Sequence, residues 1–438
     1  MRKLVSSLAA IGSAALLSTT GYLLLLPSPI ASAPETAPLS ASTTPLPLSI
    51  FCPGPVAELG GQDGTELGSL ELVGSANVFS HIGDGVLAGE MPDQIETGVP
   101  LSLSSKDQTT NALSAIQTQT VKRDRMAGLA AIYCAEPVAK GYFISGMASV
   151  GDQTILHLAN PNSTEAQVTL NVISKAGETQ KLVTLAADEQ VQISLAALAE
   201  NEAIFAIEFF SNGPAISASL QNRSVSGLAA TGLEMVAATN LAASSFIPGL
   251  EVFDNGFEEP RLRVLNPSDS EISVRVTLHG IGVNSDVFEL VVPARQLIEQ
   301  PIDLGVGDYL VELSSDSEFA SAIWSQRIGE VLDFAWLSPA ESFSDSLSLP
   351  VPQLQSELVL ANPTEDPINV SVLTSGQYQS VTIASKSQIR LEAGVPEVKV
   401  QSANSFMATL QIISESGYSV ITPKENINLG SDLQILVR

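Results

Sequence analysis

The sequence is short of several residue types on which common functions depend. Its 438 residues include two cysteines, three histidines and two tryptophans, and aromatic residues make up only 5% of the chain. Two distant cysteines and three scattered histidines cannot supply the four ligands of a structural zinc site. The sequence also lacks a Gly-rich phosphate loop and the G-x-S-x-G and H-E-x-x-H motifs. We therefore predict no metal site, no cofactor site and no catalytic residue, and we expect that the protein is not an enzyme.

Basic residues are scarce as well. The chain has 20 Lys and Arg residues against 47 Asp and Glu residues, which gives a formal net charge of -27. Such a surface repels phosphate backbones and anionic lipid headgroups, so nucleic-acid binding is disfavoured. One basic cluster occurs outside the N-terminus, at Lys122, Arg123 and Arg125. We predict that this cluster forms the tip of a hairpin, and it is a candidate contact for an acidic envelope polymer.

A long uncharged stretch occurs at the N-terminus. Arg2 and Lys3 precede an uncharged run from Leu4 to Leu26, which as a helix is long enough to cross a hydrocarbon core. The positive-inside bias keeps the two basic residues in the cytoplasm. We predict that residues 1–26 are a cytoplasmic stub and a transmembrane anchor in the inner membrane. The alternative is a signal peptide cleaved after Ala33, and both alternatives place the body of the protein outside the cytoplasm.

Residues 27–49 have a different composition. Prolines recur there among small and hydroxylated residues, a composition that cannot build a core and favours extended polyproline geometry. We predict a stalk between the anchor and the body.

The rest of the chain contains an internal repeat. Three segments share alternating apolar residues, an Asn-Pro pair, a short polar run and a second alternating stretch: ILHLANPNSTEAQVTLNV, RLRVLNPSDSEISVRVTL and ELVLANPTEDPINVSVL. The alternation predicts a strand, a turn at Asn-Pro and a returning strand. The pairs begin at Asn160, Asn266 and Asn362, a spacing of about 100 residues, which matches an immunoglobulin-like domain.

The predicted fold class is all-β, with an N-terminal transmembrane helix followed by tandem immunoglobulin-like β-sandwich domains. Each unit offers about seven short strands with turns every 8–12 residues. QTQTVKRDRMAGLAAIYC resembles QNRSVSGLAATGLEMV, so the segment before residue 141 belongs to the series as a divergent member. A β-propeller is less favoured, because its blades repeat at about 40–50 residues. The predicted domains are 50–140, 141–244, 245–345 and 346–438.

The two cysteines lie in similar surroundings, FCPGPV and YCAEPV. Outside the cytoplasm, two lone cysteines normally pair. A disulfide between Cys52 and Cys134 would staple the start of the first domain to its end. Closing a loop of about 80 residues stabilises a domain by about 4–5 kcal/mol as an upper figure.

Candidate ligand contacts are few. Sugar-binding modules stack rings on exposed aromatic residues, and only Trp324 and Trp336 are available as tryptophans. Trp324 aligns with Leu220 in the repeat, which indicates a core position, whereas Trp336 is less constrained and is the candidate contact. Carboxylates are plentiful, and a glycosidase pair would meet only in the folded chain. The dense acidic stretch VFDNGFEEP is interpreted as a tight turn.

The motifs CPGP from Cys52 and CAEPVAKGYFISG from Cys134, followed by the L-x-NP strand, resemble an actinobacterial family of membrane-anchored or secreted cell-envelope proteins of unknown function. The resemblance covers Leu4 to Asn240, with Tyr142 departing from the Trp expected before Phe143. It implies location and architecture, and it brings no catalytic residue.

The sequence therefore favours a non-catalytic, membrane-anchored extracytoplasmic scaffold or accessory protein of the bacterial cell envelope, with envelope proteins as partners. The alternative is an envelope glycan-binding module that uses Trp336, Lys122, Arg123 and Arg125. A carboxylate-based glycan hydrolase is the third hypothesis.

Overall fold

The computed structural model describes most of the chain after residue 48. The described residues are 39–41, 49–60, 70–82, 85–87, 101–104, 113–199, 202–252, 258–329, 331–425 and 433–435. The predicted anchor lies outside them, as does most of the predicted stalk. Within these residues, no helix combines the length and apolar character needed to cross a bilayer. The chain divides into two compact units, one formed by residues 1–45 with 429–438 and the other by Leu46–Asn428.

The first of these units contributes two described strands. β1 (Leu39–Ala41) and β32 (Leu433–Ile435) pair antiparallel as a two-stranded sheet. All other strands belong to Leu46–Asn428, the unit considered from here on.

Among the described residues of this unit the regular elements are strands, in agreement with the all-β prediction. Residues 140–237 form two four-stranded sheets. One sheet has the order β10 (Lys140–Met147), β15 (Ile204–Asn212), β12 (Ala166–Ser174), β13 (Gly177–Leu185). The other has the order β14 (Gln190–Ser194), β11 (Asp152–Ala159), β16 (Ser217–Ser226), β17 (Ala229–Ala237). Alternating apolar residues from both sheets, such as Phe143, Leu156 and Leu170, fill the space between them.

The third and fourth sandwiches repeat this layout, with one difference. A single long strand, β23 (Gly307–Ile328) or β30 (Glu397–Ser414), takes part in both sheets and replaces two of the strands expected from sequence. The third sandwich adds β18 (Ala242–Val252), β19 (Arg261–Asn266), β20 (Ile272–Ile281), β21 (Asp286–Val292), β22 (Gln296–Pro301) and β24 (Leu332–Leu337). The fourth adds β25 (Ser342–Pro350), β26 (Ser356–Asn362), β27 (Ile368–Thr374), β28 (Gln377–Ile383), β29 (Ser387–Glu392) and β31 (Gly417–Ile421).

The repeated asparagine has a definite structural task. Asn160, Asn266 and Asn362 are fully buried at the ends of β11, β19 and β26. In the second sandwich, the side-chain amide donates to the carbonyl oxygens of Thr164 and Ala186, both at 2.8 Å. The same pattern recurs at the other two positions. One buried amide thus satisfies carbonyls from two separate turns, which explains why the motif recurs in each copy.

The first sandwich is the divergent one. Its described strands are β2 (Ser49–Cys52), β3 (Ala57–Leu59), β4 (Leu70–Leu72), β5 (Asn77–Ile82), β6 (Gly85–Leu87), β7 (Leu101–Ser104), β8 (Leu113–Arg123) and β9 (Met126–Tyr133). Cys52 and Cys134 form the predicted disulfide, with an S–S distance of 2.00 Å. Buried glutamines bind the backbone that follows Cys52: the side-chain amide of Gln117 exchanges two hydrogen bonds with Gly54, at 2.7 and 2.8 Å.

Successive sandwiches contact each other in the same way. The first strand of one sandwich, or the residues just after it, contacts one sheet of the next sandwich. In the second sandwich this is the sheet that contains β11, and in the others it is the equivalent sheet. Buried polar contacts join Ala57 with Gln221, Gly146 with Arg263, Gly249 with Gln411, and Ser348 of the fourth sandwich with Ser114 of the first. The last contact returns to the beginning, so head-to-tail contacts of one kind close on themselves.

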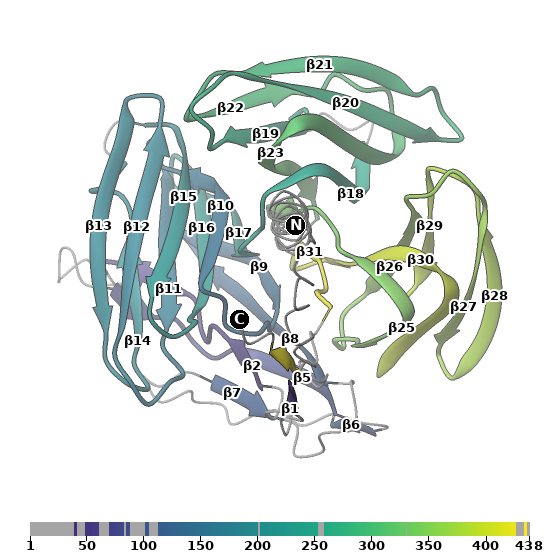
Figure 1. The fold of residues 1–438 in the computed structure, drawn as a ribbon, viewed down its shortest axis with the longest axis horizontal. Coiled ribbons are helices and arrows are strands. Elements are labelled where there is room, and N and C mark those ends of the chain that lie inside the picture. Colours follow the sequence, from purple (N-terminus) through teal and green to yellow (C-terminus); the bar gives the residue numbers. More distant parts are fainter. Residues whose placement is uncertain are drawn as a thin grey trace, which may run out of the picture. The chain divides into compact units, whose positions relative to one another are not determined.

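The last strand of each sandwich lies at the centre of this arrangement (Figure 1). β9 packs against β17 and β31, and β24 packs against the same two strands. The sandwiches are therefore grouped around four central strands, as the blades of a propeller are. The domain divisions at residues 140, 244 and 345 remain a prediction about independent folding.

Candidate functional site

The four central strands come closest together around one side chain. At the equivalent position of each strand stands Gly128, Gly232, Asp333 or Gly417. The glycines have φ values of 145°, 146° and 156°, and a methyl group at Gly128 would lie 2.7 Å from Oδ1 of Asp333. Three glycines thus leave the space that one aspartate fills.

Asp333 accepts hydrogen bonds from the backbone of all four strands. Oδ2 accepts from the amides of Leu129 at 2.8 Å and Tyr418 at 3.0 Å. Oδ1 accepts from Leu233 at 2.9 Å and from Phe334 at 3.0 Å. Burial raises the pKa of Asp333 to about 7, against the lowering effect of these four N–H groups.

A second buried carboxylate lies near Asp333. Glu234 on β17 accepts a 2.8 Å hydrogen bond from the hydroxyl of Ser419 on β31 and one of 3.0 Å from the amide of Met235. Burial raises the pKa of Glu234 well above its usual range, and the charge of Asp333 raises it further. Both oxygens of Asp333 and Oε1 of Glu234 accept hydrogen bonds from neighbouring strands, whereas the buried Oε2 of Glu234 has no hydrogen-bond partner among the described residues.

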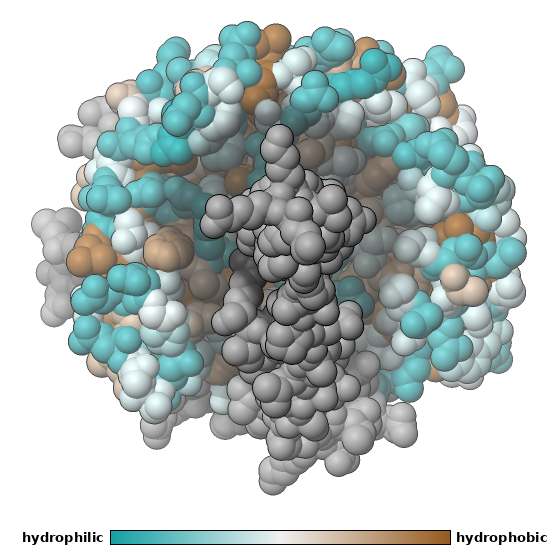
Figure 2. Space-filling model, in the orientation of Figure 1, coloured by the Kyte–Doolittle hydropathy of each residue, from teal (hydrophilic) through white to brown (hydrophobic). Residues whose placement is uncertain are grey.

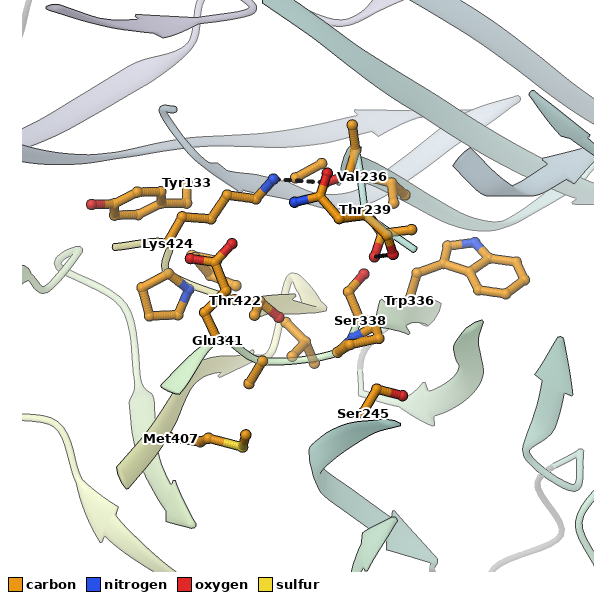
Figure 3. Close-up of a pocket in the computed structure, with 18 of the residues that line it drawn as sticks. Tyr133, Val236, Thr239, Ser245, Trp336, Ser338, Glu341, Met407, Thr422 and Lys424 are labelled. Atoms are coloured by element: carbon orange, nitrogen blue, oxygen red, sulfur yellow. Dashed lines mark hydrogen bonds between the residues drawn. The ribbon is translucent and has the colours of Figure 1, made fainter. Parts of the chain in front are cut away.

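A cavity of about 300 Å³ opens at the C-terminal ends of the same four strands (Figure 3). Residues from all four sandwiches line it, which makes it a product of the ring and not of one domain. Small residues and apolar side chains such as Phe246 and Met407 form much of its wall, together with hydroxyl groups such as those of Ser245 and Ser338. Its size falls at the lower end of the range for small-molecule sites.

Two charged side chains stand together in this cavity. The ammonium of Lys424 donates a 2.7 Å hydrogen bond to the carbonyl oxygen of Ala238. One oxygen of Glu341 accepts a hydrogen bond from the amide of Glu425 at 3.0 Å. Burial lowers the pKa of Lys424, and the carboxylate of Glu341 partly offsets this effect. Figure 3 shows the two side chains next to each other, with Tyr133 at the left of the view.

A second cavity, of about 320 Å³, adjoins the first. Lys424 and Glu341 line both, and Glu136 and Glu425 line only the second. Burial raises the pKa of Glu136, and its buried Oε1 has no hydrogen-bond partner among the described residues. The fold therefore brings carboxylates into one cavity, as the hydrolase hypothesis requires, but beside a lysine.

Trp336, the predicted contact residue, is only 2% exposed. Figure 3 shows its indole pointing away from the other labelled side chains. The ring packs between the second and third sandwiches, under the guanidinium of Arg263 at 4.5 Å. Trp324, predicted to be a core residue, is buried under Arg261 in a similar way.

The predicted basic cluster lies at the other end of β9. Residues 124 and 125 form the turn between β8 and β9, so the predicted hairpin tip is present. Arg123 pairs with Glu58 at 3.1 Å, and the carbonyl oxygen of Arg125 accepts a hydrogen bond from Arg223. Lys122 is exposed. The cluster is thus partly neutralised and distant along the strand from the cavity.

The three histidines lie on three different sandwiches, on β5, β11 and β20. His157 is buried, bonds Gln221 at 3.2 Å and has its pKa lowered by burial to about 4. His81 and His279 lie within 3.0 and 2.7 Å of a glutamate oxygen. Among the described residues, no three metal-ligating side chains gather at one point.

Comparison with known proteins places the chain in a family. Residues 91–396 match a family described as a family of unknown function, DUF5719. The chain belongs to DUF5719. The matched range includes Cys134, the three Asn-Pro pairs and Asp333, but not Cys52 or Lys424. No curated protein matches the chain in sequence.

Two solved structures show a distant likeness to this DUF5719 member. An anti-sigma factor domain-containing protein from Clostridium clariflavum is 10% identical, with 87% of this chain and 99% of that chain covered and a TM-score of 0.14. A 1.5-MDa bacterial ice-binding adhesin is 10% identical, with 65% of this chain and 96% of that chain covered and a TM-score of 0.12.

Proposed function

We propose that the protein is a non-catalytic, membrane-anchored scaffold or accessory protein of the bacterial cell envelope, which works through protein–protein contacts outside the cytoplasm. The observation that carries the proposal is the closure of four sandwiches around shared central strands. A closed ring of this kind holds the outer sheets in fixed mutual orientations, because each sandwich contacts the sandwich before it and the sandwich after it. Rigid display of several surfaces suits assembly of other proteins.

The composition of the surface supports this proposal. Hydrophilic residues cover much of the face seen in Figure 2, with isolated hydrophobic residues between them. Exposed apolar side chains such as Leu182, Val287 and Tyr378 lie on outer strands of different sandwiches. Isolated apolar residues on separate sheets fit several modest contacts better than one large interface.

The glycan-binding alternative has less support from Trp336, which lines the central cavity but is only 2% exposed. It retains the exposed Lys122 at the hairpin tip. For the hydrolase hypothesis, activity on cell-wall glycan that is lost in both Glu136→Gln and Glu341→Gln would replace the scaffold proposal.

Site-specific photo-crosslinking in intact cells of the native host tests the scaffold proposal. A photoreactive residue is placed at Leu182, Val287 or Tyr378, with Leu156 in the core as the matched buried control. We expect discrete crosslinked protein bands from one or more outer positions and none from the control. No protein adduct at any outer position, combined with sedimentation of the protein with purified cell wall, would contradict a scaffold and favour glycan binding.

A further inference from the structure

The cavity at the end of the four central strands contains an incomplete pair of charges. An ammonium group has three N–H donors. Among the described residues, the ammonium of Lys424 has a single acceptor, the neutral carbonyl oxygen of Ala238. Glu341 uses one carboxylate oxygen to accept from the Glu425 amide. Among the described residues, neither side chain forms an ion pair within 4.0 Å, although they interact electrostatically.

Lys424 and Glu341 are both half-buried in the wall of the cavity. A charged group that is partly removed from water is normally paired or hydrogen-bonded, because burial removes part of its hydration. The unused donors of Lys424 and the second oxygen of Glu341 belong to side chains that stand next to each other in the cavity (Figure 3). A ligand with separated charges can satisfy both at once, its carboxylate on Lys424 and its ammonium on Glu341.

The balance of charge distinguishes among ligands. Lys424 and Glu341 together are neutral, so a zwitterion leaves the cavity neutral. A simple anion would add a negative charge beside Glu341, in a protein whose formal net charge is already -27. A simple amine would lie beside the ammonium of Lys424. Like charges in a site of low dielectric constant repel strongly.

The remaining walls set the size and polarity of the ligand. Phe246, Met407 and Val236 provide apolar surface, and Ser245 and Ser338 provide hydroxyl groups. A volume of about 300 Å³ suits a small molecule. We propose that this cavity binds a free α-amino acid with an apolar side chain, held by Lys424 and Glu341.

Three probes of matched length test the proposal: norleucine, hexanoate and hexylamine, titrated against the full chain by ligand-observed NMR, with both enantiomers of norleucine included. We expect at least one enantiomer of norleucine to bind tenfold or more tightly than the two singly charged probes. Equal binding of all three, or no binding of norleucine, would overturn the proposal.

Two charge variants and one volume variant assign the site. Lys424→Met and Glu341→Gln should each weaken norleucine binding at least tenfold, and Ser245→Trp should weaken it by occupying the cavity. Lys122→Met, at the exposed hairpin tip, is the matched control and should bind as the native protein does. Thermal unfolding of each variant identifies those that fail to fold, and Ser245→Trp keeps the test valid if Lys424→Met unfolds. Unchanged binding in a folded Lys424→Met or Ser245→Trp variant would contradict the assignment.

Discussion

The two ends of the four central strands are built in opposite ways. Towards the N-terminal ends of β9, β17, β24 and β31, the strands close tightly around Asp333, and three glycines make room for it. At the C-terminal ends, the same strands diverge around a cavity of about 300 Å³. One end is filled by a side chain of the protein, whereas the other is left open.

The difference separates what holds the ring together from what the ring can offer to a ligand. A carboxylate that accepts four backbone amides is a structural device, because a ligand cannot reach it. A lysine and a glutamate whose hydrogen-bonding positions the described residues fill only in part, in a cavity of moderate size, have the features of a binding site. Substitutions at the two ends should therefore have different consequences, and the predictions below follow from that contrast.

The largest effect is expected at the filled end. Asp333→Ala removes the acceptor of four buried amides, each of which costs about 1–3 kcal/mol when left without a partner. We expect the free energy of unfolding to fall by at least about 4 kcal/mol, measured by denaturant titration. Asp124→Ala, in the exposed turn between β8 and β9, is the control and should change it by less than about 0.5 kcal/mol. A small effect of Asp333→Ala would show that the carboxylate does not hold the strands.

The pH dependence of stability should also report on Asp333. Its pKa is raised to about 7 in the folded protein from 3.8, so the folded state binds the proton more tightly than the unfolded state. The stability that this group contributes is fully present below about pH 4 and is lost as the pH rises through about 7. The loss amounts to about 4 kcal/mol at most.

The comparison of the native protein with Asp333→Asn reports this contribution together with the coupling between Asp333 and Glu234, because the other carboxylates titrate in both. We expect the stability of the native protein relative to Asp333→Asn to decrease between pH 4 and pH 8, in urea titrations at several pH values. A difference that does not vary with pH would refute the assignment.

A smaller effect is expected from filling the space beside Asp333. Gly128→Ala would place a methyl group 2.7 Å from Asp333 Oδ1 and 2.8 Å from the Leu233 nitrogen. Such overpacking should cost about 1–3 kcal/mol beyond the backbone strain. Gly177→Ala is the matched control, since Gly177 has a similar φ of 130° but no atom within 4 Å of the added methyl. Equal destabilisation by both would mean that conformation, not packing, limits this position.

The smallest effect is expected at the open end. Ser338→Leu adds volume to the wall of the cavity, where space is available. Its free energy of unfolding should lie within about 1 kcal/mol of the native value, in contrast to the overpacked Gly128→Ala. A loss of more than about 3 kcal/mol would show that the cavity end is packed as tightly as the Asp333 end.

Local features of the fold could be predicted from the sequence. The alternation of apolar and polar residues and the Asn-Pro pairs identified strands. The Asn-Pro pairs that begin at Asn160, Asn266 and Asn362 identified the repeat. The disulfide between Cys52 and Cys134 followed from the predicted location of the chain outside the cytoplasm, and the burial of Trp324 followed from its alignment with Leu220. These features depend on residues close in sequence or on a repeat visible in it.

The centre of the ring could not be predicted in this way. Aligning the two similar segments by their shared GLAA residues makes Gly128 equivalent to Gly227. In the structure, the amides that donate to Asp333 follow Gly128 and Gly232, so these two glycines are the equivalent ones. The correct register depends on how strands from separate sandwiches meet, which no local pattern encodes. Lys424 and Glu341 belong to different sandwiches, so only the closed ring brings them into one cavity. Trp336 is less constrained by the repeat, and its burial depends on the contact between two sandwiches.

Hydrogen exchange at four amides tests the central claim most directly. If one carboxylate holds all four sandwiches together, the amides of Leu129, Leu233, Phe334 and Tyr418 should be strongly protected to a similar degree. In Asp333→Asn, exchange at all four should accelerate together. Independent exchange of these amides in the native protein, each at the rate of its own sandwich, would contradict the account.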